Sequence, residues 1–169
     1  LYGCAIAKAN GAGMGIGLDS VDDRIRISKK FGSVENINVS NLSEQEIVQR
    51  VRELCPPDGA DVVIEVCGQP SVIPSGIEML RTGGIYVIGG LVNPDAMLTL
   101  DGNSILKKML TIKGIHNYHP RHLIQALDFV MSNQDRFPFG EIVDSKFSLD
   151  QIDTASEKAA ARSVLRAAI

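Results

Sequence analysis

The chain has 169 residues, of which 44% are hydrophobic and 22% charged, values typical of one ordinary globular domain with enough chain for a core. Its formal net charge of −3, without a dense basic run, argues against a nucleic-acid partner. No apolar run is long enough to span a bilayer, and the N-terminus lacks the ordered parts of a signal peptide. We therefore expect a soluble protein that binds neither nucleic acid nor membrane.

The three cysteines, Cys4, Cys55 and Cys67, are odd in number and widely spaced. This argues against a disulfide framework and is typical of a reducing cytoplasm, where we expect the protein to lie. None of them forms a Cys-x-x-Cys pair, so no structural zinc is expected.

Apolar periodicity and turn residues predict helices and strands that alternate along the chain. The predicted helices cover residues 1–10, 22–31, 43–54, 71–80, 103–109, 120–131 and 149–161. The predicted strands cover residues 14–19, 35–39, 62–64, 85–88, 110–115, 142–147 and 164–169. This alternation predicts an α/β fold with a largely parallel sheet.

Local signals add detail to three of these elements. Ser43 and Glu46 have capping-box spacing at the start of a helix. The β-branched run 62–64 is typical of a fully buried parallel strand. The pair Gly83 and Gly84 is expected to stop the helix that precedes it.

Four glycines spaced by single residues, from Gly11 to Gly17, look at first like a phosphate-binding loop. Such a loop follows a strand and opens a helix, whereas this stretch ends a helix and enters a strand. We therefore interpret it as a helix C-cap and a tight turn.

Asp19 ends the first strand and is the residue around which the functional hypothesis is built. In dinucleotide-binding βαβ units, an acid at this place binds the adenosine ribose, about 20 residues after the glycine-rich loop. Counting back from Asp19 places the last glycine of that loop immediately before Leu1. The expectation is a Rossmann-like, doubly wound sheet that lacks its first strand and its glycine-rich loop. Alternatively, Asp19 caps the helix that follows it.

Several motifs lie along the whole chain in an order that resembles the cofactor domain of the medium-chain, zinc-type alcohol dehydrogenases. They are Ile16-Gly-Leu-Asp19 followed by Arg24, Gly59-Ala-Asp-Val-Val-Ile-Glu-Val-Cys-Gly68, Gly83-Gly-Ile-Tyr-Val-Ile-Gly89, Thr111-Ile-Lys-Gly114 and Arg162-Ser-Val-Leu165. The stretches 116–123 and 136–139 are similar to a branch of this family found with phosphonate-degradation genes.

The resemblance implies a role for each of ten cofactor-binding positions. Asp19 would hold the adenosine ribose and repel a 2′-phosphate, which favours NAD over NADP, and Arg24 would lie beside that ribose. Arg162 would reach the pyrophosphate with its forked guanidinium. The remaining positions would line the adenine end (Val66, Cys67, Gln69), the nicotinamide ribose (Ile88, Gly89, Gly90) and the nicotinamide (the backbone of 115–117, with His116).

Simpler readings exist for several of these residues. Arg24 alone would be a solvated helix residue, and Arg162 gains meaning only from its place before the last strand. Cys67 is most often a small buried hydrophobe. Glu65 is expected to be a satisfied polar group at the carboxyl edge of the sheet.

His116, His119 and His122 form a His-x-x-His-x-x-His pattern that invites a metal hypothesis. Their spacing crosses a strand end, a proline and a helix start, so it does not bring the imidazoles together. No carboxylate or thiolate completes the set. We expect surface histidines and no metal site.

The leading interpretation is a single, truncated NAD-binding domain over residues 1–169 that belongs to an alcohol dehydrogenase. In this family the catalytic zinc lies in an N-terminal domain that the chain lacks, so the intact parent would oxidise a small alcohol and this chain alone would be inactive. The alternatives are a non-catalytic nucleotide-binding or interaction module and a ribose-holding methyltransferase. A short-chain dehydrogenase is disfavoured because no tyrosine has a lysine four residues later.

The strand order 3-2-1-4-5-6 of a doubly wound sheet places the first strand in the middle. Without it, strands 14–18 and 62–66 would flank an empty slot with unpaired backbone groups. Exposed strand edges pair readily with other chains. We therefore expect a homo-oligomer rather than a stable monomer.

Overall fold

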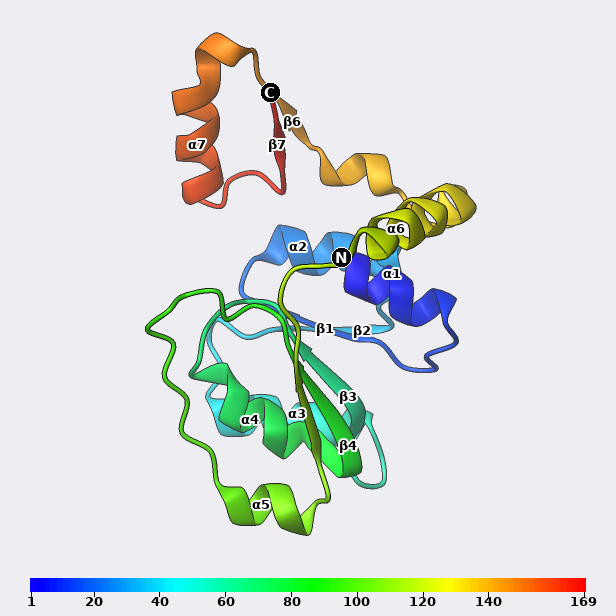
Figure 1. Cartoon of the computed structure of the whole chain (residues 1–169), viewed down its shortest axis with the longest axis vertical. Helices are drawn as coiled ribbons and strands as arrows, with labels where there is room; N and C mark the ends of the chain where they lie inside the picture. Colours follow the sequence, from blue (N-terminus) through cyan, green and yellow to red (C-terminus); the bar gives the residue numbers. More distant parts are fainter. The chain divides into compact units, whose positions relative to one another are not determined.

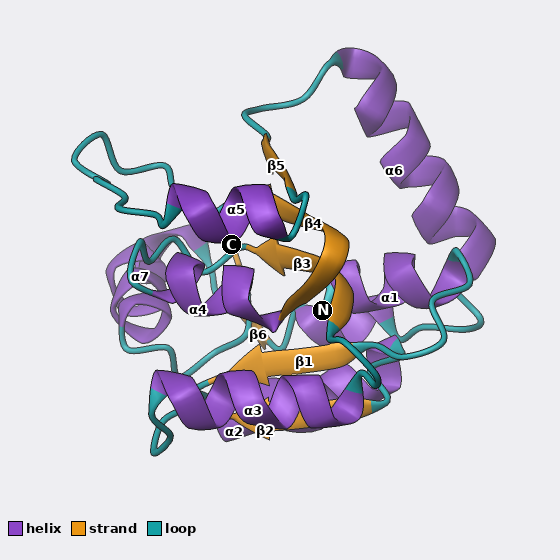
Figure 2. Cartoon of the chain, turned by 90° about the horizontal axis from the view of Figure 1, so that it is seen from below, coloured by secondary structure: helices purple, strands orange, loops and turns teal.

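A computed structural model describes all residues, 1–169, and divides the chain into two compact units. The first unit comprises Leu1–Asn36 and Tyr118–Ile169, and the second comprises Ile37–Asn117. Each unit contains both helices and strands, labelled in Figure 1 and coloured by type in Figure 2. No helix has the length and apolar character needed to cross a bilayer.

The first unit holds most of the elements predicted near the two ends of the chain. They are α1 (Tyr2–Ala9), β1 (Ile16–Asp19), α2 (Asp22–Ser28), η1 (Lys29–Phe31), α6 (Pro120–Asn133), η2 (Phe139–Ile142), β6 (Ser145–Lys146), η3 (Leu149–Gln151), α7 (Ile152–Ala160) and β7 (Ala167–Ala168). Its core contains Ala5, Phe31, Phe137 and Ile142. The strands predicted over 142–147 and 164–169 form as only two residues each, because β6 and β7 pair only with each other.

Glycine ends the first helix, as the sequence predicts. Gly11 has φ 89°, and its N–H donates to the carbonyl of Lys8 at 3.2 Å. The next N–H, from Ala12, donates to the carbonyl of Ala7 at 3.0 Å. These bonds satisfy carbonyls at the helix end, so this glycine-rich stretch is a C-cap rather than a phosphate loop.

The second unit is built on three parallel strands. β3 (Ala60–Glu65) pairs with β4 (Leu80–Ile88), which pairs with β5 (Thr111–Gly114), and the helices are α3 (Glu44–Leu54), α4 (Val72–Met79) and α5 (Gly102–Lys107). Helix α4 packs on β3 and β4 (Figure 2). The core consists of Ile73, Ile77, Leu80 and Tyr86, all but inaccessible to solvent. The α/β class and the parallel pairing are confirmed.

The first five strands form two separate sheets. β1 pairs with β2 (Glu35–Asn38), while β3, β4 and β5 form a separate sheet, so β1 and β3 do not pair with each other. Each of these two strands therefore has one strand neighbour only. The association state stays a prediction.

The strand 62–64 is parallel as predicted, but the prediction that it is fully buried is wrong. Val62 and Ile64 are 48% and 52% exposed. They alternate with Val63, which packs against the core of the second unit. Ile85, the partner of Val62 on the doubly paired strand β4, is also 39% exposed, so helix α4 covers the face of Val63 while the face of Val62 and Ile64 is left open.

The expectation that Gly83 and Gly84 stop the preceding helix is also wrong. Helix α4 ends at Met79, and Leu80 is already paired with Ala60 at the start of β4. The register then shifts, because Ile85 is the residue that pairs with Val62. The two glycines lie in this irregularity, where Gly83 takes φ 74°, so they shape a bulge in the strand rather than a helix end.

Lys108 satisfies the C-terminal end of helix α4. Its ammonium group donates to the carbonyls of Ile77, Glu78 and Leu80 at 3.3, 3.0 and 3.0 Å. Burial lowers its pKa below the ordinary value, and the charge of Arg52 acts in the same direction. Carbonyls at a helix end attract a cation, so this lysine links the end of α4 to the start of β4.

The predicted capping box of helix α3 is present. The Ser43 hydroxyl accepts from the N–H of Glu46 at 3.3 Å, and the Glu46 carboxylate accepts from the Ser43 N–H at 2.8 Å. The backbone N–H of Ser43, and then its hydroxyl, lower the pKa of Glu46 below the ordinary 4.5.

This capping box predicts a pH dependence of stability. The pKa of Glu46 is lower in the folded chain than in the unfolded chain. The stability that its carboxylate adds is therefore complete above about pH 4.5 and is lost as the pH falls through the folded pKa. Glu46→Gln keeps an acceptor but removes this titration. We expect its urea midpoint to fall less than that of the wild type between about pH 6 and pH 3. Glu53→Gln on the same helix is the control. If the urea midpoint fell equally with pH in the wild type and in both variants, the stabilising role of the Glu46 carboxylate would be contradicted.

Candidate coenzyme site

The ten predicted cofactor-binding residues fall into two groups, one in each unit. The first unit holds Asp19, Arg24 and Arg162. The second unit holds the remaining seven, which are Val66, Cys67, Gln69, Ile88, Gly89, Gly90 and His116.

Asp19 is the last residue of β1, as predicted. Its carboxylate accepts from the N–H of Val21 at 3.0 Å, closing a short turn into helix α2. The N-cap of α2 is Val21, which makes no side-chain cap bond, so the alternative in which Asp19 caps this helix is wrong. A half-buried carboxylate at a strand end suits an acceptor for ligand hydroxyls.

A pocket of about 310 Å³ lies in the first unit, bordered by helix α2 and by the segment between α7 and β7. Its charged lining residues are Asp23, Arg24, Arg26, Lys30, Glu141, Asp144 and Arg162. Arg24 and Arg162, which the sequence analysis assigned to the coenzyme, therefore share one pocket. The sequence separates them by more than a hundred residues, so only the fold brings them together.

Most of the other charges in this pocket are already engaged. Arg26 pairs with Asp23 at 2.7 Å, and Lys30 pairs with Glu141 at 2.7 Å. Asp144 accepts from the backbone N–H of Leu165 at 2.9 Å and from that of Arg166 at 3.4 Å.

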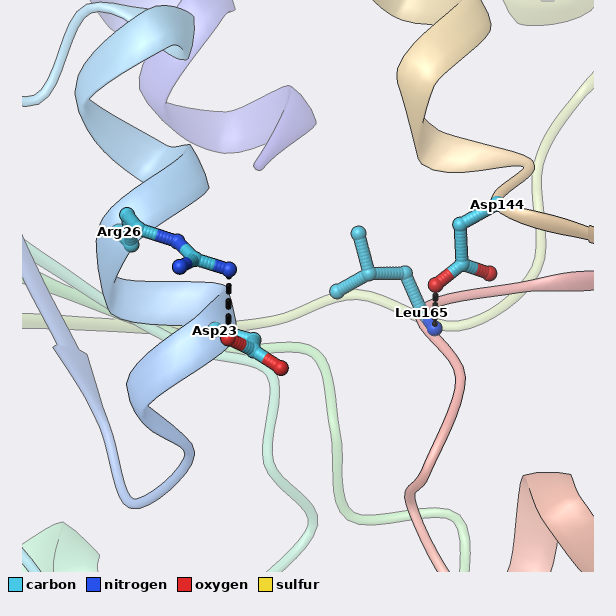
Figure 3. Close-up of polar contacts among 4 residues, drawn as sticks. All are labelled: Asp23, Arg26, Asp144 and Leu165. Atoms are coloured by element: carbon cyan, nitrogen blue, oxygen red, sulfur yellow. Dashed lines mark hydrogen bonds and ion pairs between the residues drawn. The ribbon is translucent and has the colours of Figure 1, made fainter.

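Figure 3 shows two of these contacts, the Arg26–Asp23 pair on α2 and the contact between Asp144 and Leu165. The guanidinium groups of Arg24 and Arg162 make no hydrogen bond or ion pair within the chain. The donors of these two guanidinium groups, which border the same pocket, are therefore not used within the chain. Guanidinium forks suit phosphate oxygens.

Arg162 occupies a backbone position that favours glycine. It has φ 54° and follows Ala161, the C-cap of α7. Its N–H donates to the carbonyl of Ala159, and the N–H of Ser163 donates to that of Lys158, each at 3.1 Å. This is the Schellman ending, in which glycine usually occupies the left-handed position. A residue with a Cβ atom costs stability at this left-handed position.

The second group gathers at the carboxyl ends of the parallel strands. Glu65 pairs with Ile88, and Ile88 pairs with Gly114, so the three strands end at the same level. The N–H of Gly89 donates to the carbonyl of Glu65, and that of Ile115 to the carbonyl of Ile88, each at 2.9 Å. The predicted residues therefore lie just beyond one edge of the sheet, where open α/β sheets bind ligands.

Glycine is required at two points of this edge. Gly68 has φ 77°, and a Cβ atom there would lie 2.8 Å from the carbonyl oxygen of Gly90. A Cβ on Gly90 would lie 2.5 Å from both a Glu65 carboxylate oxygen and the Gly68 nitrogen. The loops after β3 and β4 thus approach each other so closely that neither glycine can be replaced without movement.

Cys67 differs from the buried hydrophobe that its residue type suggests, because the residue is exposed. Local desolvation, with a smaller contribution from Glu65, raises the pKa of its thiol above the ordinary 9.0. A protonated thiol is neither a nucleophile nor a metal ligand at neutral pH.

The three histidines make local contacts. The His119 ring accepts from the N–H of Arg121 at 3.3 Å and so caps α6. The His122 ring lies 3.2 Å from the Nε atom of Arg121, and the His116 ring lies 2.9 Å from the side-chain nitrogen of Asn117. The chain contains no cluster of three or more His, Cys, Asp or Glu side chains that could hold a metal ion.

Sequence reasoning missed the polar frame of the pocket. The sequence analysis gave no role to Lys30, Glu141 or Asp144. All three line the same pocket as Arg24 and Arg162, and their contacts join its different segments. No local spacing could have revealed them, since Lys30 and Glu141 are joined only by tertiary contact.

Comparison with known proteins places this geometry in a family. The model of the zinc-binding dehydrogenase family matches residues 1–132. Among curated relatives, 5-exo-hydroxycamphor dehydrogenase of Pseudomonas putida is 27% identical over 164 residues, 97% of this chain and 45% of the relative. L-threonine 3-dehydrogenase of Bacillus subtilis (strain 168) is 35% identical over 116 residues, 68% of this chain and 32% of the relative.

The solved structures that resemble the chain are also dehydrogenases. An alcohol dehydrogenase zinc-binding domain protein from Burkholderia ambifaria has a TM-score of 0.84 at 28% identity, covering 97% of this chain and 43% of that protein. Benzyl alcohol dehydrogenase from Acinetobacter calcoaceticus has a TM-score of 0.85 at 25% identity, covering 97% and 44%. The chain spans less than half the length of these relatives. It belongs to the zinc-binding dehydrogenase family.

Proposed function

We propose that the chain is the coenzyme-binding portion of an NAD-linked alcohol dehydrogenase whose substrate is a small alcohol. The observation that carries this proposal is the pair of unpartnered arginines, Arg24 and Arg162, which border one pocket in the unit where Asp19 ends β1. Two guanidinium groups and a carboxylate are complementary to a pyrophosphate with an adjoining ribose. The names of the relatives, which are dehydrogenases, support the same class.

Each residue then has one task. Asp19 accepts hydrogen bonds from the adenosine ribose, with Arg24 beside it, and Arg162 holds the pyrophosphate. Residues Val66, Cys67 and Gln69 form the adenine side of the second group, and Ile88, Gly89, Gly90 and the backbone at His116 form the nicotinamide side. Bound NAD would supply the acceptor for a hydride from the alcohol carbon.

Titration calorimetry of the purified chain with NADH tests this proposal directly. We expect saturable binding of one NADH per chain. Inorganic pyrophosphate should compete with it, because both use the two arginines. Absence of binding heat up to a concentration on the order of 1 mM would contradict the proposal.

Coenzyme choice gives a second, sharper test. Replacing Asp19 by alanine removes a charged acceptor for the ribose and the repulsion of a 2′-phosphate. We expect the ratio of NADH to NADPH affinity to fall at least about tenfold, since one hydrogen bond to a charged group is worth that much.

The matched control for this test is Asp135→Ala, which removes one exposed carboxylate of the same unit outside the pocket. Its coenzyme ratio should equal that of the wild type. A wild-type preference for NADPH would overturn the role of Asp19.

A further inference from the structure

Glu65, the last residue of β3, is only 4% exposed and lies where the strand leads into the predicted coenzyme loops. Its carboxylate oxygens accept hydrogen bonds from two different loops. One accepts from the N–H of Gly68 at 2.6 Å, and the other accepts from the N–H of Gly90 at 3.1 Å. Its own carbonyl accepts from the N–H of Gly89.

Glu65 makes no ion pair, so these backbone donors are its charge partners. Burying a carboxylate is costly unless hydrogen bonds compensate. An ionised carboxylate only accepts, and its two oxygens can receive one N–H from each loop at the same time. A glutamine has one acceptor oxygen, and its NH₂ group would face the second N–H donor.

The two loops that the carboxylate joins approach so closely that neither glycine has room for a Cβ atom. A Cβ on Gly90 would lie within 2.5 Å of a Glu65 oxygen, and one on Gly68 would meet the carbonyl of Gly90. The pKa of the neighbouring Tyr86 hydroxyl is raised, first by the burial of Tyr86 and second by the negative charge of Glu65, as expected for a carboxylate close to that side chain.

We propose that Glu65 is a positioning residue that clamps the loops after β3 and β4 in the geometry that receives the coenzyme. This inference rests on the proposed function, because those two loops carry Val66, Cys67 and Gln69 on one side and Gly89 and Gly90 on the other. Glu65 does not touch the coenzyme itself. It sets the distance between the loops through two charge-assisted hydrogen bonds, which are stronger than neutral ones.

Amide hydrogen exchange, followed by NMR on the whole chain, tests the clamp without any coenzyme. In the wild type, the amide protons of Gly68 and Gly90 should exchange at least about a hundredfold more slowly than in an unstructured peptide. In Glu65→Gln, at least one of them should exchange about tenfold faster than in the wild type.

Ligand titrations of Glu65→Gln test whether loss of the clamp weakens coenzyme binding. NADH affinity should fall at least about tenfold in Glu65→Gln, because an unpaired N–H shifts one loop. Pyrophosphate affinity should stay within about twofold, because the arginines that bind it belong to the other unit. Asp61→Asn is the matched control, since it removes one exposed carboxylate of the same strand, and it should leave both affinities unchanged.

The outcomes separate the inference from the function on which it rests. Wild-type exchange at Gly68 and Gly90 as fast as in a peptide would overturn the clamp, even if Glu65→Gln fails to fold. Faster exchange in the variant with unchanged NADH affinity would reduce Glu65 to a structural role and overturn its positioning. A wild-type chain that binds no NADH would overturn the proposed function, and the exchange rates would then decide the clamp alone.

Discussion

Replacing Arg162 by glycine is expected to weaken NADH binding at least about tenfold while the chain stays as stable as before or becomes more stable. Affinity falls because one of the two unpartnered guanidinium groups of the pocket is lost, and a charge-assisted bond to phosphate is worth at least that factor. Stability does not fall because position 162 has φ 54°, which glycine adopts without strain. Relief of the left-handed strain, about 1–2 kcal/mol, is partly offset by the greater entropy of unfolded glycine, about 0.5–1 kcal/mol.

Two further variants separate charge, geometry and backbone at this position. Arg162→Lys keeps the charge and the strain but loses the fork, so its affinity should lie between those of wild type and Arg162→Gly. Arg166→Gln removes a nearby charge outside the pocket and should leave NADH affinity unchanged. Urea unfolding and calorimetry on all four chains provide the measurements. Loss of stability together with affinity in Arg162→Gly would mean that the arginine is structural.

The same substitution, glycine to alanine, is expected to have opposite effects on stability at two helical positions. At Gly76 in α4, a Cβ atom would lie 2.6 Å from a ring carbon and 2.7 Å from the hydroxyl of Tyr86, which is 1% exposed. The ring cannot yield inside the core, so Gly76→Ala should lower the free energy of unfolding by about 1–3 kcal/mol. At Gly3 in α1 nothing lies within 4 Å, and Gly3→Ala should raise it by up to about 1 kcal/mol.

A double variant shows whether Tyr86 is the obstacle. Tyr86→Phe should rescue Gly76→Ala only in part, because a ring carbon is in contact as well as the hydroxyl. Tyr86→Leu opens space, so its combination with Gly76→Ala should be less destabilised than the sum of the single changes. Chemical denaturation with two-state analysis gives all of these values. Additive effects of Gly76→Ala and Tyr86→Leu would show that the contact with Tyr86 is not the cause.

The sequence by itself determined the elements whose ends depend on near neighbours. Gly11 closes α1, Gly32 follows η1 with φ 91°, and Ser43 forms its capping box with Glu46. The hydrogen bonds involved span at most five residues, so the residue types at those spacings are sufficient information. The alternation of these elements also indicated the α/β class, and the motifs in register indicated the family.

The tertiary structure decided everything that depends on which strands and side chains become neighbours. Val62 and Ile64 have the composition of a buried strand, yet they are half exposed because they lie on the face of the sheet opposite Val63 and helix α4. Gly83 carries a helix-stop signal, yet the long pairing of β4 places it in a bulge.

The site follows the same division. The strand end at Asp19 and the place of Arg162 before the last strand were readable from spacing, whereas the pocket that Arg24 and Arg162 share was not. The two loops joined by Glu65 were not readable either. Contacts between residues far apart in sequence depend on burial and pairing along the whole chain, and these are properties of the folded state rather than of any local stretch.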